Sequence, residues 1–504
     1  MATWYVAESS LGDGSGSSAL NAKPISWLND AANWNGTGEI CDDATKNSIQ
    51  DVIRFVGTIT TPFEWPYATS TGSAGIKFAF EPGAKFSAAT FTNGAMKWES
   101  AAYAKHNVVV DGEGVGIIEC TATGTALANQ VNNVGIYFIS ANNVTIKNLT
   151  IRNLYVRTFP SNDQVDGGSG IYGATSNGAY TGLLVEDCTF YDMNIAINVP
   201  YTTGSSSYTF RRNEAYNINW GIGCGSTASD SSMTGFLAED NWFHDFEKWG
   251  ADIGFEAFHH NGIFCFGSNG TNNFADAIIR RNKFGPNFGE RATSGVYLSS
   301  YGMVGTYQVY NNLFVGSTSN GLITIGTGNG ATTRVMNNTF LCNDAARACI
   351  NIGGSSSTGM TVYLRNNVCE GGQFIYGNYT DTVTLDSDYN TAGGYSTPPN
   401  VTSWSSNENA SPRTWAQWQT MGHDAHSLHE EDLLLDADGR LGTGSPALEA
   451  GVDLSAYFTT DYDEVTRVAP WDMGAYEGEG ETPPATTGNP LAFRSNAMLA
   501  MGAF

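Results

Sequence analysis

The chain has 504 residues, of which 41% are hydrophobic, and it carries 24 Lys and Arg against 49 Asp and Glu, for a formal net charge of -25. So negative a chain is a poor partner for nucleic acid, and it binds another polyanion only where cations bridge the two. The sequence contains no run of 18 apolar residues and no basic segment followed by an apolar leader, so it predicts no membrane span and no secretion signal.

Residues 1–50 are expected to cap the end of the structure that follows, because the open edge of a sheet otherwise presents unpaired N–H and C=O groups. Within this cap, residues 26–34 form one turn-rich helical pattern with an apolar face. That face consists of Trp27, Leu28, Ala31 and Ala32. Residues 51–396 form the main domain, which opens with irregular strands predicted at 52–60, 75–86 and 107–120.

A short pattern recurs between residues 182 and 390 and organises the chain. Each copy ends in a polar turn and an apolar residue, as in LLVEDCTF, IIRRNKF and RVMNNTF, and copies recur about every 26 to 41 residues. The closing apolar residues are Phe190, Tyr216, Phe243, Phe284, Phe314, Phe340 and Cys369. Three residues before them stand Asp187, Asn213, Asp240, Arg281, Asn311, Asn337 and Asn366. Most copies also contain a Gly followed by alternating apolar residues, as in GIFCFG and GLITIG.

Repeats of this length are typical of stacked architectures, in which no unit can bury its apolar face alone. The strands leave no room for a crossover helix, which predicts an all-β coil of parallel sheet with one turn of chain per rung. The closing apolar residues should then form one stacked interior column, and the Asn and Asp side chains should hydrogen-bond their equivalents in the next rung. A β-propeller or a β-sandwich is the alternative, but a propeller blade needs about 40 to 45 residues and four strands.

The eight cysteines contain no CxxC pair, and several fall at inward strand positions. Small apolar thiols suit such positions, so we expect stacked free cysteines. A set of disulfides is the alternative.

The bend after the closing apolar residue varies in length, and all these bends lie on one edge of a coil. The long segments 152–170 and 244–261 stand on either side of two short bends, so we expect a cleft about 10 to 15 Å wide between them. An aromatic ring among amides suits a sugar, whose CH groups pack on the ring while its hydroxyls bind the amides. Besides Tyr191, Asp192 and Asn217 on the floor, the candidate substrate-binding residues are Tyr155, Arg157, Asn194, Asn219 and Trp220. Packing of Trp220 beneath a loop is the alternative.

Groups able to titrate near neutrality are concentrated in segment 244–261. The candidate catalytic residues are Lys248, Asp252, Glu256, His259 and His260. For β-elimination from a uronic acid, Lys248, His259 or His260 would remove the C5 proton, while Arg157 or a carboxylate-held Ca²⁺ neutralised the sugar carboxylate. For hydrolysis, two carboxyl groups about 5 to 9.5 Å apart are required, and Asp252 could supply them with Glu256 or Asp163. A solvated structural loop is the alternative reading of this segment.

Residues 397–477 are expected to close the other end of the coil. His423, His426 and His429 follow one another at a spacing of three, but no metal site is assigned to them. Residues 478–489 are a linker rich in Pro, Thr and Gly. Residues 490–504 form an apolar tail too short to span a membrane, which predicts contacts with other copies of the chain, as in a homotrimer, or with a larger assembly.

The rungs resemble those of right-handed parallel β-helix proteins of the pectate-lyase-like superfamily. TWYVAESSLGDGSGSSALNA is similar to the N-terminal segment of that superfamily, and TWAQWQTMGHDAHSL, GSPALEAG and DMGAYE are similar to its closing segment. The resemblance covers most of residues 3–477 and implies a right-handed parallel β-helix with an N-terminal cap and a C-terminal closing segment. Because this fold hosts lyases, hydrolases, epimerases, adhesins and phage tailspikes, it implies no single activity.

The missing leader, the apolar tail and the fold together favour a virion-attached, phage tailspike- or fibre-like protein. Such a protein would recognise a cell-surface polysaccharide and could depolymerise it, and its other partners would be virion proteins or further copies of itself. Its location would be extracellular or on the virion surface. The alternatives are a secreted polysaccharide lyase or glycoside hydrolase, and a non-catalytic structural or decoration protein.

Overall fold

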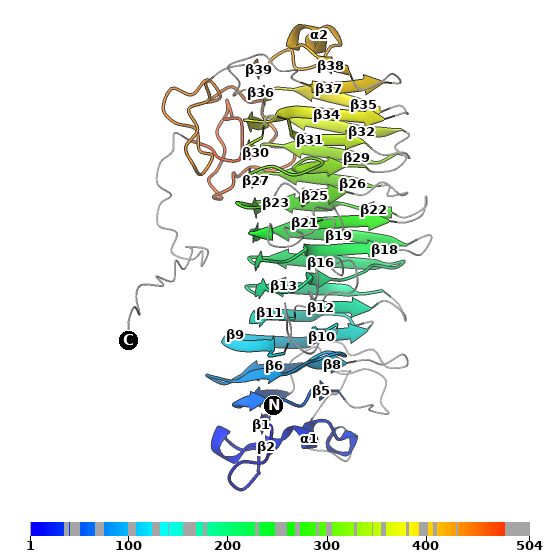
Figure 1. Ribbon diagram of the computed structural model, residues 1–504, viewed down its shortest axis with the longest axis vertical. Coiled ribbons are helices and arrows are strands. Elements are labelled where there is room, and N and C mark those ends of the chain that lie inside the picture. The colour runs from blue at the N-terminus through cyan, green and yellow to red at the C-terminus, as the bar shows by residue number, and fades with distance from the viewer. Residues whose placement is uncertain are drawn as a thin grey trace.

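The computed structural model places the chain in a coil of stacked strands, with α1 (Ile25–Leu28) at one end and α2 (Trp415–Thr420) at the other (Figure 1). Two short 3₁₀ turns, Ala19–Asn21 and Ala31–Asn33, lie near the first end. None of the helices within the described residues has the length and hydropathy of a membrane-crossing segment. The residues that the structure describes are 2–34, 40, 51–65, 75–98, 107–122, 132–139, 141–154, 168–174, 179–226, 231–246, 260–267, 273–288, 292–298, 305–326, 330–344, 346–353, 359–379, 383–392, 402–406, 411–429 and 432–478.

Two sheets run along the coil, and a two-stranded sheet of β36 (Thr391–Ala392) and β39 (Leu428–His429) lies near its C-terminal end. The long sheet contains β1 (Thr3–Ala7), β2 (Lys23–Pro24), β3 (Asp51–Phe55), β4 (Thr58–Ile59), β6 (Ile76–Phe80), β7 (Lys85–Ala88), β9 (Val108–Cys120), β11 (Val144–Arg152), β13 (Thr181–Glu186), β14 (Thr189–Tyr191), β16 (Ser205–Arg211), β17 (Glu214–Tyr216), β19 (Ser232–Glu239), β20 (Trp242–His244), β22 (Asn273–Ala275), β23 (Ala277–Arg280), β24 (Lys283–Phe284), β26 (Thr306–Tyr310), β27 (Leu313–Val315), β29 (Thr332–Met336), β30 (Thr339–Leu341), β32 (Met360–Arg365), β33 (Val368–Glu370) and β35 (Val383–Asp388). The second sheet contains β5 (Phe63–Glu64), β8 (Met96–Trp98), β10 (Val134–Ile139), β12 (Ser169–Ala174), β15 (Ile195–Asn198), β18 (Trp220–Ser226), β21 (His260–Gly267), β25 (Ala292–Leu298), β28 (Ile323–Ile325), β31 (Ala348–Gly353), β34 (Gln373–Tyr379), β37 (Thr402–Ser406) and β38 (Ser411–Arg413).

One rung consists of a strand of the second sheet followed by two consecutive strands of the long sheet, which we call its first arm and its second arm. In one rung these are β18, β19 and β20, and each pairs in parallel with its equivalent in the next rung. Neighbouring strands are parallel throughout the two sheets except at β37 and β38, which are antiparallel. The predicted parallel coil is therefore confirmed.

The predicted interior column is confirmed along most of its length. Phe284, Phe314 and Phe340 are fully buried and stack with ring centroids 4.7 and 4.9 Å apart. The Gly that opens the strand of the second sheet faces this column. A Cβ on Gly262 would lie 2.6 Å from the Phe284 ring, so only Gly leaves room for the phenyl group.

Tyr216 does not belong to this column, and that prediction is wrong. The strand register pairs Phe190 with Ala215 and Ala215 with Phe243, so the buried Ala215 occupies the interior position. In this copy, NEAY, the aromatic residue comes one position later than in copies such as NKF and NTF. Tyr216 therefore points to the outside of the coil.

An Asn ladder joins the rungs at the turn between the two arms. Asn213 belongs to it as predicted, and its next five members lie one residue later than predicted. Each Nδ2 donates to the Oδ1 of the next rung at 2.9 to 3.1 Å, and the ladder members are Asn213, Asn241, Asn282, Asn312, Asn338, Asn367 and Asn390. In the rungs other than that of Asn213, the predicted column supplies the turn residue that precedes the ladder position, such as Asp240 or Asn311, whose φ is positive. Asn and Asp tolerate this left-handed conformation, which explains their frequency there.

The C-terminal segment, residues 411–478, closes the ladder before it leaves the end of the coil. Asn390 donates to Oδ1 of the buried Asp424 at 3.0 Å, and the Trp418 indole donates to its Oδ2 at 2.7 Å. His423, His426 and His429 pack against the rings of Trp418, Tyr389 and Trp415, respectively. Aromatic packing therefore explains the three histidines.

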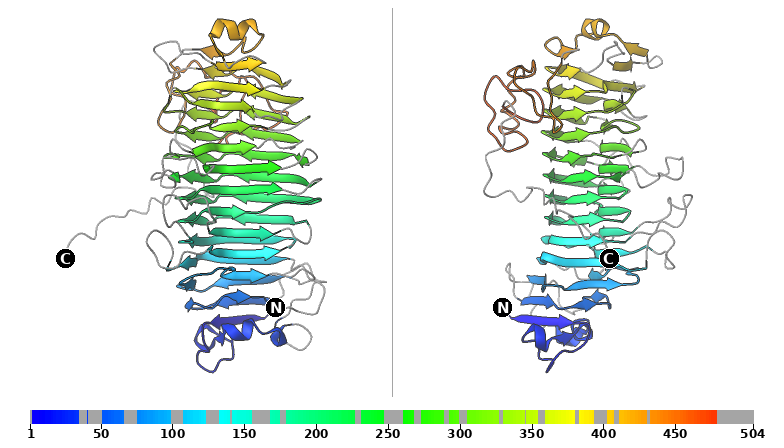
Figure 2. Two further views of the ribbon diagram at one scale, coloured as in Figure 1. Left: turned by 45° about the vertical axis from the view of Figure 1, so that its right-hand side comes forward. Right: turned by 60° about the vertical axis from the view of Figure 1, so that its left-hand side comes forward.

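The rest of the C-terminal segment lies along the side of the coil, beside the later rungs of the long sheet (Figure 2). Arg467, whose side chain is fully buried, donates to Oδ1 of Asn311 at 2.9 Å. Asn337 donates to the carbonyls of Asp472 and Gly474, both at 3.0 Å. This segment therefore covers the outer face of the later rungs as well as the end of the coil.

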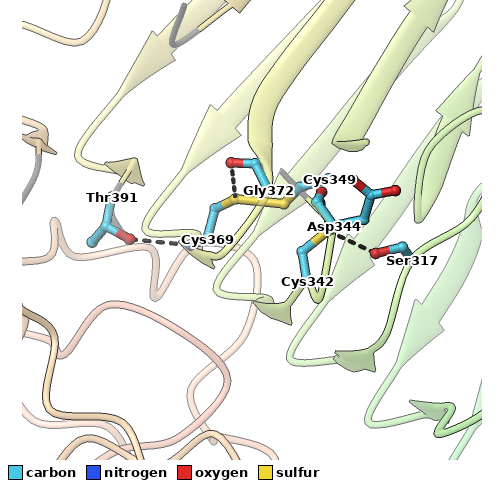
Figure 3. Close-up of a disulfide and its surroundings, with 7 residues drawn as sticks. All are labelled: Ser317, Cys342, Asp344, Cys349, Cys369, Gly372 and Thr391. Carbon is cyan, nitrogen blue, oxygen red and sulfur yellow. Dashed lines mark hydrogen bonds between the residues drawn. A yellow bond between two sulfur atoms is a disulfide. The ribbon is translucent and has the colours of Figure 1, made fainter. Parts of the chain in front are cut away.

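The expectation of free cysteines holds for the described Cys120, Cys188, Cys224, Cys265 and Cys342, all of them buried. It is wrong for Cys349 and Cys369, which form a disulfide between the second sheet and the second arm (Figure 3). Their Cα atoms are 6.8 Å apart, although 20 residues separate them in sequence. Burial raises the pKa of Cys120 to about 12, which keeps that thiol protonated.

The N-terminal end differs from the predicted helix. Only residues 25–28 are α-helical, Leu28 is buried, and Ala31 and Ala32 are exposed because they lie in the separate 3₁₀ turn. Asp30 accepts from the Ala32 N–H at 3.0 Å and so begins this turn. Trp34 supplies the missing apolar cover, with 2% of its surface exposed.

Candidate functional site

A column of polar and aromatic side chains follows the outer face of the second arm. The register pairs Glu119 with Arg152, Arg152 with Tyr191, Tyr191 with Tyr216 and Tyr216 with His244. Side chains of a strand alternate between its two faces, so these residues point away from the interior column. We call this set, together with Trp242 and Glu214, the outer column.

Stacked rings form the centre of the outer column. The rings of Tyr191 and Tyr216 are nearly parallel, with centroids 4.8 Å apart and an interplanar angle of 8°. Tyr216 and His244 follow at 5.1 Å and 20°, and Trp242 lies 3.8 Å from His244. Both tyrosines keep part of their surface in solvent, whereas only 8% of His244 is exposed. The result is a partly exposed aromatic surface across three rungs.

Arg152 is fixed at one end of this surface. Its Nε donates to Glu119 at 2.8 Å and its Nη1 donates to the Tyr191 hydroxyl at 2.8 Å. Glu119 also accepts from Lys85 at 2.8 Å and Ser87 at 2.9 Å. Burial raises the pKa of Glu119, but hydrogen bonds from Lys85, Arg152 and Ser87 outweigh that effect and lower the pKa overall. Glu119 therefore stays ionised and orients the guanidinium.

His244 is held between two carboxylates at the other end. Its Nδ1 lies 2.6 Å from Oδ2 of Asp245, and its Nε2 lies 3.3 Å from Oε1 of Glu214. Both nitrogens can donate at once only in the imidazolium form. Glu214, whose side chain is 38% exposed, is therefore both held by His244 and accessible to a ligand.

The Tyr216 hydroxyl forms no hydrogen bond within the described part of the chain, so it is available to a ligand. Burial, and then its neighbours Tyr191, Glu214 and Asp192, raise the pKa of Tyr216. The phenol is therefore neutral at physiological pH and can donate as well as accept a hydrogen bond.

The bend after the second arm contains the amides that the sequence singled out. Asn219 donates to Oδ1 of Asn194 at 2.9 Å and is 4% exposed, so its amide joins two rungs. Asn217 and Asp192 directly follow the second arm in their two rungs, and both have positive φ. The Asn217 amide donates to Asp192, so this pair also joins the two rungs. The short bends are thus held by amide and carboxylate pairs that form the edge of the aromatic surface.

Trp220 begins β18 on the other side of this bend and is partly buried. Its ring meets Phe264 edge-on at 4.9 Å, and a Cβ on Gly223 would lie 3.1 Å from the indole. Within the described residues its Nε1 is buried and has no hydrogen-bond partner. Much of this ring is therefore occupied by packing, and its contact with a sugar stays a prediction.

The candidate catalytic residues are mostly beyond what the structure describes. His260 lies at the start of β21 with 2% of its surface exposed. The candidates outside the described residues are Tyr155, Arg157, Asp163, Lys248, Asp252, Glu256 and His259. No group of three or more His, Cys, Asp or Glu side chains able to hold a metal ion occurs among the residues that are described.

The sequence interpretation missed Arg152, Glu214, Tyr216 and His244 as members of one site. These residues could have been found by aligning the copies on the Asn of the turn instead of on the aromatic residue. If the copies are aligned on the Asn that begins NEAY and NWFH, Ala215 and Phe243 fall inside, and Tyr216 and His244 fall together outside. Tyr191 was placed on the floor of the expected cleft, and the structure puts it in the outer column.

The search against protein-family models found no match, and neither did the search of curated proteins. Among solved structures, the complex of XylC with xylose aligns with a TM-score of 0.51 and 10% identity over 94% of this chain and 98% of that one. The GH136 lacto-N-biosidase from Eubacterium ramulus aligns with a TM-score of 0.46 and 13% identity over 76% and 68% of the two chains. Pectate lyase Pel9A aligns with a TM-score of 0.42 and 15% identity over 95% and 96%. Together with the strand topology, the XylC alignment shows that the chain has the parallel β-helix fold expected from its pectate-lyase-like rungs.

Proposed function

We propose that the protein binds a polysaccharide across the outer column, with sugar rings packed against Tyr191 and Tyr216. The observation that carries this proposal is the partly exposed stack of Tyr191, Tyr216 and His244 with hydrogen-bonding groups at both ends. Aromatic faces accept the CH side of a sugar, while its hydroxyls need donors and acceptors nearby. Arg152, the Tyr216 hydroxyl and Glu214 supply those groups.

The outer face of the second arm is available only in part, which supports this location. In later rungs the C-terminal segment covers it, since a Cβ on Gly439 would lie 2.9 Å from Leu313, and Ala475 donates to the Thr339 hydroxyl at 2.9 Å. The cover begins near Lys283, whose Nζ is 3.8 Å from Asp438. The aromatic part of the outer column lies before that boundary.

The composition and the comparison point the same way. A net charge of -25 disfavours nucleic acid as the polymer that binds such an elongated surface. XylC, which aligns over 98% of its own length, was solved as a complex with xylose, which makes a saccharide a reasonable first ligand to test here.

Depolymerisation is a second candidate function. It is favoured by the contact of His244 with Glu214 at the edge of the aromatic surface, because His and Glu are the side chains that most often act as general acids and bases. A lyase would raise the absorbance of unsaturated ends from uronate polysaccharides, whereas a hydrolase would release reducing sugar without that absorbance. Virion attachment has no support beyond the sequence interpretation, and its proposed tail, residues 490–504, lies outside the described residues.

The direct test of binding is a glycan array followed by titration calorimetry with the best ligand. Tyr216→Ala should weaken binding by about 1 to 3 kcal/mol, by analogy with other aromatic stacking platforms. Tyr376→Ala is the matched control, because Tyr376 is also partly exposed but lies on β34 of the second sheet. Equal affinities of the two folded variants would place the site elsewhere. Trp220→Ala then tests whether the sugar extends around the bend.

A further inference from the structure

The charges around the aromatic surface are unevenly paired. The guanidinium of Arg152 is engaged by Glu119, with Nε at 2.8 Å and Nη2 at 2.7 Å, and by the Tyr191 hydroxyl. Lys85 at 2.8 Å also neutralises Glu119. The positive end of the outer column is therefore already occupied by its own counter-charge.

The other end retains negative charge. Glu214 meets no cation other than His244 within the described residues, and His244 also contacts Asp245. Asp192 accepts from the neutral Asn217 amide, with no cation beside it among the described residues. Besides burial, both carboxylates raise the pKa of the Tyr216 phenol, and Arg152, which is already paired with Glu119, opposes them. A ligand stacked on Tyr216 would therefore lie beside Glu214, which shares the His244 imidazole with Asp245, and beside Asp192, which pairs only with an amide within the described residues.

Carboxylates at the edge of an aromatic surface have two effects on a sugar. They accept hydrogen bonds from hydroxyl groups, and charge-assisted bonds of this kind are stronger than neutral ones. They also repel a second carboxylate, because like charges brought together at an interface suppress binding of the wrong partner. The same two residues can thus attract a neutral sugar and reject an acidic one.

We propose, building on the binding function proposed above, that the glycan bound at this surface carries no carboxylate and that Glu214 and Asp192 are specificity-determining residues. The ligand class is a polymer of neutral hexoses or pentoses. This inference runs against a polyuronate as substrate, which the sequence interpretation had left open for the lyase alternative.

The test compares matched ligands that differ only in the carboxyl group. Uronate oligosaccharides and their carboxyl-reduced counterparts are titrated into the full-length protein, together with the best array ligand and, where that ligand is a hexose polymer, its C6-oxidised form. We expect the neutral member of each bound pair to bind at least about tenfold more tightly. Glu214→Gln should reduce that ratio several-fold, and so should higher salt, which screens the repulsion.

Asp344→Asn is the matched control, because it also removes one negative charge and its carboxylate, paired with Arg347 at 3.5 Å, lies away from the outer column. Its neutral-to-acidic ratio should equal that of the wild type. An array ligand that is itself a uronate, or a ratio that Glu214→Gln leaves unchanged, would overturn the inference. If uronates bind well and Tyr216→Ala weakens their binding, the proposed binding function stands and only the inferred specificity for neutral sugars is wrong. If no glycan binds the wild type, both are wrong.

Discussion

Phe314→Ala and Tyr216→Ala should separate the stability of the coil from its binding function, because the two rings lie on opposite faces of the second arm. Phe314 is fully buried between Phe284 and Phe340, with ring centroids 4.7 and 4.9 Å away. Removing it leaves a cavity that the rungs on either side hold open. Such a change should lower the free energy of unfolding by about 3 to 5 kcal/mol.

Tyr216 has a different environment. Part of its surface stays in solvent, and its removal deletes stacking contacts with Tyr191 and His244 without opening a cavity in the core. Aromatic pairs contribute roughly 0.5 to 1.5 kcal/mol each, so we expect Tyr216→Ala to lose about 1 to 2 kcal/mol of stability. Its main effect should be on glycan affinity.

Urea unfolding followed by circular dichroism gives the free energy of unfolding of both variants under identical conditions. Calorimetric titration of the same samples gives their affinities. The reasoning is refuted if Tyr216→Ala costs as much stability as Phe314→Ala, since Tyr216 would then be a core residue. It is also refuted if folded Phe314→Ala loses binding while Tyr216→Ala retains it.

Three further changes test other parts of the structure. Asn312→Ala removes the buried side-chain oxygen that accepts from the Asn282 backbone N–H at 2.9 Å. We expect urea unfolding to show a free energy of unfolding lowered by about 2 to 5 kcal/mol, and by less than about 1 kcal/mol for the control Asn351→Ala, whose side chain is partly exposed. Arg467→Met should make the C-terminal segment sensitive to limited proteolysis, because a buried charge partner of Glu477 is lost; an unchanged digestion pattern would contradict that anchoring role. Because the folded-state pKa of Glu119 is lowered, its stabilising contribution is present above its unfolded pKa and disappears as pH falls through the lowered value. The Tm of the wild type should therefore fall more steeply than that of Glu119→Gln on acidification below about pH 4.5, and parallel curves would refute this assignment.

The coil and its interior column could be predicted because both depend on repetition alone. Phe284, Phe314 and Phe340 recur at a fixed place after each turn, and only stacked rungs bury them together. Apart from Asn213, the ladder was placed one residue early, because several copies contain two consecutive Asn, such as Asn311 and Asn312. Only the backbone separates their roles, since the first adopts positive φ and the second points inward.

The outer column could not be read in the same way. Alignment on aromatic residues put Tyr216 inside, and a shift of one residue in a strand moves a side chain to the opposite face. Tyr191, Tyr216 and His244 are separated by bends of different length, so their stacking becomes visible only with the register between rungs. The Cys349–Cys369 disulfide could not be predicted for a similar reason, because its two strands belong to different sheets and meet only across the folded coil.

The central claim is that sugar binds on the outer face of the second arm, and a crystal structure with the best array oligosaccharide tests it most directly. The account predicts sugar density over the rings of Tyr191 and Tyr216, with hydroxyl groups within hydrogen-bond distance of Glu214 or Arg152. Density confined to the second sheet, with the two tyrosine rings left in contact with solvent, would contradict it.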